Sequence, residues 1–148
     1  MRSAVTERLR SPPTRPLSRA AIHSDRRVNK ALARADARKW HYAVLATLDE
    51  FGPASQAELS SRTGIYRSDL VAVIKELTER GLTERAPDPA DRRRNMVTLT
   101  EPGRRQLLRL GKLLADVEDE VLAPLSPAQR EQLTYLLTTL VNDHGQQI

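Results

Sequence analysis

Apolar residues recur at helical spacing along most of the chain, which predicts a mainly α-helical fold. The predicted helices cover, in chain order, about residues 24–35, 36–50, 56–62, 66–80, 100–122 and 126 onward. The period changes between residues 82 and 99, where two short segments, 83–86 and 95–99, flank a loop with two prolines and a cluster of charges. This pattern predicts a small two-stranded β hairpin. Because an isolated hairpin is only marginally stable in water, we expect it to pack against the helices.

Capping residues mark where several of these helices begin and end. Ser55 and Glu58 have the spacing of a capping box, in which the side chain of each residue accepts from the backbone amide of the other. Gly64 suits a tight turn, because glycine readily takes the left-handed conformation. Thr100 and Ser126 are expected to cap the last two helices. The resulting order of helices, tight turn and hairpin is that of a winged helix-turn-helix with flanking helices.

The last two helices carry more apolar surface than one small domain needs. Five apolar residues repeat at intervals of three and four, as in a coiled-coil seam: Leu107, Leu110, Leu114, Val117 and Val121. The helix after Ser126 has a broad leucine-rich stripe, and a second copy of the chain would bury it most simply, so we predict a homodimer. The predicted segments are a disordered basic arm (1–17), an N-terminal dimerisation helix (18–36), a winged helix-turn-helix (37–104) and C-terminal dimerisation helices (105–148).

Charge is distributed unevenly along the 148 residues. The net charge is +5, but residues 1–40 hold 11 basic and 3 acidic side chains, whereas residues 113–148 hold 1 and 6. Such segregation suits a protein with one face toward a polyanion. The absence of cysteine excludes disulfides and thiolate metal sites, and no apolar run approaches the roughly 20 residues of a membrane span. We expect a cytoplasmic, nucleoid-associated protein that needs no cofactor and does not contact a membrane.

The segment from Leu48 to Leu107 carries a series of motifs. They are Gly52-Pro53, Gln56-Ala57-Glu58-Leu59, Gly64-Ile65-Tyr66-Arg67-Ser68, Leu77 through Leu82, and Asp88 through Arg93 continuing into Val97 through Arg104. On these motifs the chain resembles the DNA-binding module of the MarR family of bacterial winged helix-turn-helix transcriptional regulators. The resemblance implies a sequence-specific regulator, a repressor in the family's commoner mode, that acts on a pseudo-palindromic double-stranded operator.

The resemblance also implies that the helix over residues 66–80 enters the major groove, with its first turns nearest the bases. The residues expected to contact DNA from this region are Ser55, Gln56, Tyr66, Arg67, Ser68, Asp69, Val71, Ala72 and Lys75. Arg67 is expected at a guanine edge or a phosphate, and Val71 and Ala72 at thymine methyl groups. Asp69 either accepts from a cytosine amino group, orients Arg67, or interacts with the positive helix N-terminus; we favour the orienting role.

The hairpin loop over residues 87–94 forms the wing. Asp91, two residues before Arg93, resembles the family's wing tip, where the aspartate holds the arginine so that its guanidinium enters a narrow minor groove. Arg92 and Arg94 are then expected to contact phosphates. The alternative is a solvated hairpin tip whose arginines serve solubility, and the helix-turn-helix upstream favours the DNA-binding interpretation.

Four residues are candidates for a pocket that binds a small aromatic or phenolic effector: Trp40, His41, Tyr42 and Phe51. Plain core packing is the alternative for all four. The histidines are too scattered to predict a metal site, and no nucleophile motif, phosphate loop or pair of catalytic carboxylates indicates an enzyme. The alternative function is a winged-helix module that binds an acidic protein partner, or DNA without sequence preference.

Overall fold

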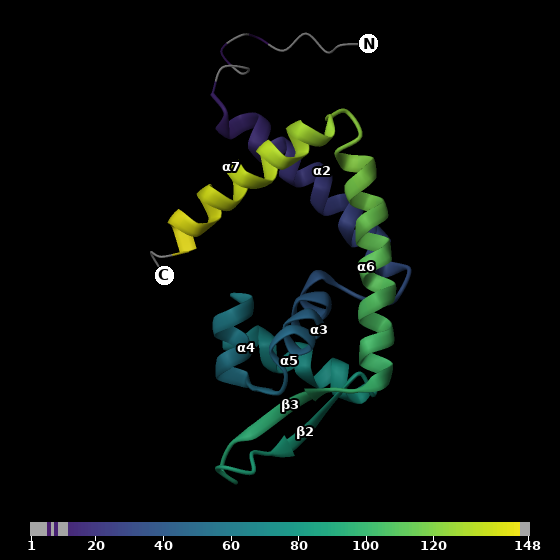
Figure 1. Cartoon of the computed structure of the whole chain (residues 1–148), viewed down its shortest axis with the longest axis vertical. Coiled ribbons are helices and arrows are strands. Elements are labelled where there is room, and N and C mark those ends of the chain that lie inside the picture. The colour runs from purple at the N-terminus through teal and green to yellow at the C-terminus, as the bar shows by residue number, and fades with distance from the viewer. Residues whose placement is uncertain (1–5, 7, 9–11, 146–148) are drawn as a thin grey trace.

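The computed structural model describes residues 6, 8 and 12–145, and the described part is mainly helical with one small sheet (Figure 1). The elements are α2 (Thr14–Ala33), α3 (Lys39–Phe51), β1 (Ala54–Ser55), α4 (Gln56–Thr63), α5 (Arg67–Glu79), β2 (Thr83–Pro87), β3 (Asn95–Leu99), α6 (Glu101–Val121) and α7 (Pro127–Gly145). In Figure 1, α3, α4, α5 and the sheet gather at one end, α2 and α7 cross at the other, and α6 runs between the two ends.

The first described helix begins earlier than predicted. The sequence pattern predicts a helix from about residue 24 and disorder up to residue 17, but α2 begins at Thr14 and includes Pro16. Proline is tolerated there because the amides of a first helical turn have no partner within the helix. The predicted disordered arm is therefore wrong for residues 14–17, and most of its remainder lies outside the described residues.

The sheet has three strands rather than the predicted two, in the order β1-β3-β2, and all neighbours are antiparallel. The hairpin of β2 and β3 is as predicted, with Thr83 opposite Leu99. The additional strand is short: Ala54 pairs with Val97, and both side chains are buried. Its pairing gives the backbone between α3 and α4 a hydrogen-bonding partner, and it attaches the hairpin to the helix-turn-helix.

The predicted caps are present. The Ser55 hydroxyl accepts from the Glu58 amide at 3.2 Å, and the Glu58 carboxylate accepts from the Ser55 amide at 3.4 Å. Gly64 has a φ of 74°, as a left-handed C-cap requires. The Thr100 hydroxyl accepts from the Gly103 amide at 3.0 Å. These caps depend on residues only three or four positions apart, which is why the sequence pattern predicts them.

The core lies where the end of α2, the middle of α6 and the winged domain meet. Its fully buried large apolar residues are Leu32, Val44, Leu45, Leu59, Leu70, Val73, Ile74, Leu77, Val97 and Leu110. Among the described residues they come from α2, α3, α4, α5, β3 and α6, so the core joins the winged domain to α2 and α6. No described residue of α7 belongs to this core.

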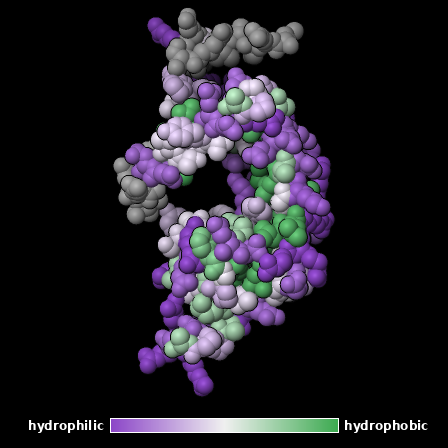
Figure 2. All heavy atoms as spheres, viewed as in Figure 1, coloured by the Kyte–Doolittle hydropathy of each residue, from purple (hydrophilic) through white to green (hydrophobic). Residues whose placement is uncertain are grey.

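The two C-terminal helices differ in how they are covered. The apolar seam predicted on α6 is covered by other helices of the same chain: Leu110 and Val117 are buried, and α6 packs against α2 and α3. α7 instead exposes Tyr135 and, on one side of the helix, a row of four large apolar residues: Leu136, Leu137, Leu140 and Val141. Figure 2 shows an opening through the molecule between α7 and the winged domain. Among the described residues, no helix is long and apolar enough to cross a membrane.

Candidate nucleic-acid interface

The outer face of α5 carries most of the residues predicted to contact DNA. The opposite face packs into the core through Leu70, Val73, Ile74 and Leu77, as predicted. Just before the helix, the Tyr66 side chain is 74% exposed. The exposed residues that follow on α5 include Arg67, Ser68, Val71, Ala72 and Lys75, and Asp69 is half-buried. The predicted residues of α5 therefore share one accessible surface.

The turn between α4 and α5 fixes the direction in which α5 leaves it. The Ser60 hydroxyl donates to the Ile65 carbonyl at 2.7 Å, and the Thr63 hydroxyl accepts from the Ile65 amide at 3.2 Å. The Ile65 side chain between them is buried. Because both backbone groups of Ile65 are bonded and its side chain is packed, α5 is held firmly against α4.

The orienting role favoured for Asp69 stays a prediction. No ion pair joins Asp69 to Arg67 among the salt bridges of the described chain. The carboxylate lies in the first turn of α5, where a negative charge interacts favourably with the helix dipole. This is one of the alternatives that the sequence leaves open, and a contact with cytosine stays a prediction.

The wing tip is built from two aspartate turns. The Asp88 carboxylate accepts from the Ala90 amide at 2.9 Å, and the Asp91 carboxylate accepts from the Arg93 amide at 3.0 Å. Asp91 therefore holds the backbone of Arg93, and no ion pair of the described residues joins its carboxylate to the Arg93 guanidinium; entry of that guanidinium into a minor groove stays a prediction. The physical reason is that an aspartate side chain reaches the amide two residues ahead more readily than a long, exposed guanidinium. Asp91 shapes the loop that presents Arg93.

The three arginines of the wing have different environments. The Arg94 guanidinium donates to the Glu58 carboxylate at 3.0 Å, so it connects the wing to the start of α4. A DNA phosphate would therefore have to compete with the Glu58 carboxylate for the Arg94 guanidinium, and the phosphate contact of Arg94 stays a prediction. Arg92 and Arg93 are exposed, and neither forms an ion pair with a residue that the structure describes. These two arginines are the ones available to a polyanion.

Arg85 joins the site although it was not predicted. It lies on β2 opposite Val97, whose other neighbour is Ala54 on β1, so these three side chains share one face of the sheet. Arg85, Arg94, Ser55 and Gln56 line a concave site of about 460 Å³ beside the start of α4. The first amides of a helix have no partner within it and attract anions. Strand alternation indicates the face of Arg85, but only the pairing with β1 places it beside α4.

The four predicted effector-pocket residues do not line one cavity. Trp40 lines a shallow site with Asn29 and Ala33, whereas Tyr42 lines a different one with residues of α2, α6 and α7. Phe51 is exposed, and the Arg62 guanidinium lies 4.7 Å from the centre of its ring. His41 is buried and bonded to α5. The four residues thus share none of the cavities described for the single chain, because successive residues of a helix point in different directions, and an effector pocket formed by them stays a prediction.

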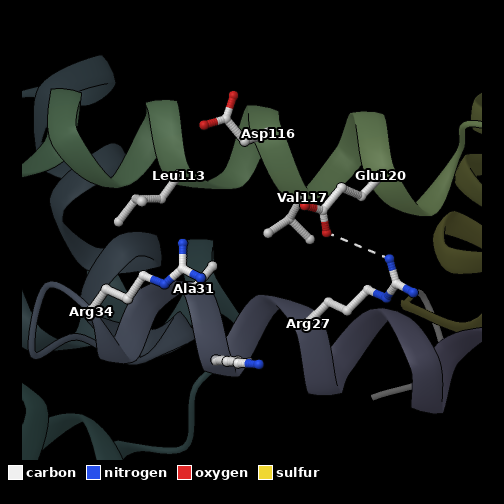
Figure 3. Close-up of a pocket in the computed structure, with 8 residues that line it drawn as sticks. Arg27, Ala31, Arg34, Leu113, Asp116, Val117 and Glu120 are labelled. Atoms are coloured by element: carbon white, nitrogen blue, oxygen red, sulfur yellow. Dashed lines mark hydrogen bonds and ion pairs between the residues drawn. The ribbon is translucent and has the colours of Figure 1, made fainter.

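The groove between α2 and α6 is polar. Figure 3 shows Leu113 and Val117 of α6 pointing toward α2, and Glu120 reaching toward Arg27 of α2. Arg34, just after the end of α2, lies at the other end of the groove, and Asp116 points away from α2. Arg27 reaches Glu120 at 3.5 Å, but both side chains are more than half exposed, so the pair contributes at most about 1 kcal/mol. The cavity lined by Tyr42, about 460 Å³, is more apolar and suits an aromatic ligand better.

The chain combines a short helix, a tight turn, a second helix with an exposed face, and a hairpin that bears exposed arginines. These features define a winged helix-turn-helix protein. The family model described as MarR family matches residues 37–94, which span this whole unit up to the wing. Together with the fold, and with a solved repressor structure that is 30% identical and 99% covered by this chain, the match shows that the chain belongs to the MarR family.

The transcriptional repressor NicR of Pseudomonas putida is 30% identical over 101 residues, which cover 68% of this chain and 64% of NicR. The chain thus spans slightly under two thirds of that relative. The structure of the repressor CouR of Rhodococcus jostii on a 23-mer DNA duplex is 30% identical, with a TM-score of 0.85 over 94% of this chain and 99% of CouR. Bordetella bronchiseptica BpsR, whose DNA binding is regulated by 6-hydroxynicotinic acid, is 25% identical, with a TM-score of 0.80 over 93% of this chain and 97% of BpsR.

Proposed function

We propose that this chain is a sequence-specific transcriptional repressor that binds a pseudo-palindromic double-stranded operator as a homodimer. The observation that carries the proposal is the continuous exposed face of α5 beside a wing with two arginines free of ion pairs in the described chain. Exposed basic residues on both the recognition helix and the wing, Arg67, Lys75, Arg92 and Arg93, are what binding to a polyanion requires. NicR and CouR, both named repressors, support repression rather than activation.

Each part of the site has a distinct task in this proposal. α5 lies in the major groove, where Arg67 reads a guanine edge or binds a phosphate, and Val71 and Ala72 contact thymine methyl groups. Arg93 enters the minor groove, whose negative potential is strongest where it is narrow. Arg85 and the first amides of α4 bind a phosphate between these two contacts. The phosphate contacts position the protein, and the base contacts provide the specificity.

The homodimer is proposed from the exposed apolar row on α7. Soluble monomers rarely expose contiguous apolar patches of this kind, and α7 has no place in the core of its own chain. A two-fold pair of winged domains would then read half-sites about one helical turn apart, and the protein would work in the cytoplasm at the nucleoid.

Footprinting on the intergenic DNA beside the protein's own gene tests the proposal. We expect a protected region with two-fold symmetry, and fluorescence anisotropy should give an affinity that falls with salt but exceeds that for a random duplex of equal length. Equal affinity for both duplexes would refute sequence-specific regulation. It would favour a winged-helix module that binds DNA without preference, and no binding to either duplex would favour one that binds an acidic protein.

Variants of the wing make this test specific. Arg93→Ala should cost about 1–3 kcal/mol of operator affinity. Arg26→Ala on α2 removes the same charge from an exposed residue away from the wing, and it should leave the affinity nearly unchanged. Equal losses in the two variants would mean that only net charge matters and that the wing does not enter the groove.

A second part of the proposal is relief of binding by a small aromatic effector. The cavity lined by Val28, Tyr42, Leu114, Leu133 and Leu137 supports it, because it is partly apolar and lies where α2, α6 and α7 meet. BpsR and CouR, which are similar to this chain, respond to or bind such molecules: 6-hydroxynicotinic acid and p-coumaroyl-CoA.

The test uses 6-hydroxynicotinic acid as the probe. It should weaken operator binding by the wild type and by Leu108→Trp, which alters an exposed residue of α6, but not by Leu133→Trp, which fills the cavity. An unchanged response in Leu133→Trp would place the effector elsewhere. Unchanged operator binding in the wild type would exclude this acid as the effector.

A further inference from the structure

A polar junction connects the turn between α2 and α3 to the rear half of α5. On the α5 side it consists of Glu76 and Arg80, and on the other side of Asp36, Arg38 and His41. The Arg80 guanidinium donates to the Asp36 carbonyl at 2.6 Å, and the Arg38 guanidinium donates to the Glu76 carboxylate at 2.6 Å. Two successive turns of α5 are therefore bonded to the segment in which α2 ends and α3 begins.

His41 is the buried centre of this junction. Its side chain is 4% exposed, its Nδ1 lies 3.0 Å from the Arg38 amide, and its Nε2 lies 2.6 Å from a Glu76 carboxylate oxygen. An amide can only donate, so Nδ1 must be the acceptor and carry no proton. A carboxylate can only accept, so Nε2 must carry the proton. The geometry thus selects one neutral tautomer of the ring.

Protonation of His41 is incompatible with this arrangement. It would place an N–H on Nδ1 against the N–H of Arg38, so the bond at the start of α3 would be lost. The charged groups around the ring are Arg38, the N-cap of α3, Glu76 on α5, and Arg80, the C-cap of α5. Burial holds the pKa of His41 below its ordinary value of 6.5, although the hydrogen bond to Glu76 opposes this shift. The ring is therefore neutral at neutral pH and charges in acid.

The junction bears on the DNA-binding face of α5. Glu76 follows Lys75 directly and lies one helical turn after Ala72, and both of these residues belong to the exposed face. A bond that fixes Glu76 against α3 also fixes the rotation of this face relative to the α2–α3 turn. Asp36 in that turn has a left-handed φ of 51°, so the turn has little freedom to follow a displaced α5.

We propose that His41 is a positioning residue for the recognition helix: its neutral imidazole holds α5 to the α2–α3 turn through Glu76, and protonation of the ring weakens specific operator binding. This inference rests on the proposed function of the chain. It goes beyond that function because it makes operator binding sensitive to acid through a residue that does not face the DNA.

The first experiment does not depend on DNA. Long-range nitrogen–proton NMR spectra of the imidazole rings in the full-length chain identify which nitrogen carries the proton. We expect His41 as the Nε2–H tautomer near pH 7.5, with a change to the doubly protonated ring only well into the acid range. A proton on Nδ1 near pH 7.5, or a doubly protonated ring at that pH, would overturn the proposal.

The second experiment compares affinities for the footprinted operator and for a random duplex of equal length at constant salt, from about pH 7.5 down through the pH range in which the NMR spectra show His41 becoming doubly protonated. Circular dichroism at each pH restricts the comparison to folded protein. Over that range the operator affinity of the wild type should fall by roughly 5-fold or more relative to the random duplex. An unchanged ratio of the two affinities would overturn the role of His41. Equal affinities at pH 7.5 would instead refute the proposed function.

Three variants identify the residue responsible. His23→Gln alters an exposed histidine of α2 and should keep the pH profile of the wild type. Glu76→Gln retains an acceptor for Nε2 but removes the charge that favours imidazolium, so the loss of affinity should move to lower pH. His41→Gln should make the affinity ratio independent of pH in this range. A wild-type profile in both junction variants would refute the proposal, and Glu76→Gln suffices for this test if His41→Gln does not fold.

Discussion

Gly103, in the first turn of α6, makes the closest backbone approach of any glycine in the described chain. A Cβ atom placed on it would lie 2.0 Å from the Leu82 carbonyl oxygen and 2.8 Å from a methyl group of Leu99. The Leu82 carbonyl cannot easily withdraw, because it accepts from the Thr100 amide at 3.3 Å. We therefore expect Gly103→Ala to force the hairpin and α6 apart.

The size of the effect follows from the overlap. Ordinary contacts of a Cβ atom are 3.4–4 Å, so the backbone must move by more than 1 Å to accommodate alanine. Overpacking typically costs about 1–3 kcal/mol, and an overlap with backbone lies at or beyond the upper end of this range. Alanine in a helix gains about 1 kcal/mol over glycine, which offsets part of the cost. The expected net loss in the free energy of unfolding is about 2 kcal/mol or more.

Gly111 in the same helix is a matched control, because nothing lies within 4 Å of the Cβ position built on it. Gly111→Ala should raise the free energy of unfolding by about 0.5–1 kcal/mol. Urea unfolding followed by circular dichroism, with all proteins at one protomer concentration, measures both values. Equal free energies of unfolding for Gly103→Ala and Gly111→Ala would refute the close approach of the Leu82 carbonyl to Gly103. Operator affinity should also fall only in Gly103→Ala, because the displaced hairpin carries the wing.

Three further predictions concern the phosphate site, the dimer and pH. Arg85→Ala should weaken binding to operator and random duplexes alike and reduce the salt slope by about 1, as titrations at several salt concentrations would measure; a loss confined to the operator would mean that Arg85 reads bases. Leu140→Glu should give a monomer in sedimentation at micromolar concentration, because a charge on the exposed apolar row of α7 cannot be buried in a dimer; an intact dimer would place the interface elsewhere. The pKa of His41 is lowered by burial and that of Glu76 by hydrogen bonds from His41 and Arg38, so the folded state binds fewer protons than the unfolded state. The contribution of His41 and Glu76 to the free energy of unfolding is complete above their pKa values in the unfolded chain, 6.5 and 4.5. It is lost as the pH falls through their lower pKa values in the folded chain. In urea unfolding across this pH range, the free energy of unfolding should fall more steeply with decreasing pH for the wild type than for His41→Gln. Equal slopes for the two proteins would contradict a lowered pKa of His41 in the folded state.

The helices and their caps are predictable because their interactions are local. Ser55 with Glu58, and Thr100 with Gly103, join residues three positions apart, and such bonds form wherever the helix forms. The inward face of α5 is likewise predictable from helical spacing alone. The sequence pattern does not predict the early start of α2, because the first turns of this helix carry prolines and charges and no apolar period.

The candidate site likewise contains features that local sequence predicts and features that it does not. Its exposed residues on α5 and the loop of the wing follow from motif order and periodicity. The partners of its charged groups do not: Arg94 bonds Glu58, and His41 bonds Glu76, over separations of 36 and 35 residues. Which distant side chains meet depends on how the helices pack, and the side-chain pattern of one segment says nothing of the segment it will face.

The sequence by itself therefore determined the elements, their order, the buried face of α5 and the basic wing, because periodicity and capping act within a few residues. The tertiary structure alone decided that β1 joins the sheet, that Arg85 lies beside α4, that His41 is held as one neutral tautomer, and that position 103 must be glycine. In each of these cases the deciding contact is made by a segment distant in sequence. Such a contact exists only after the hairpin, α3 and α5 have packed around a common core.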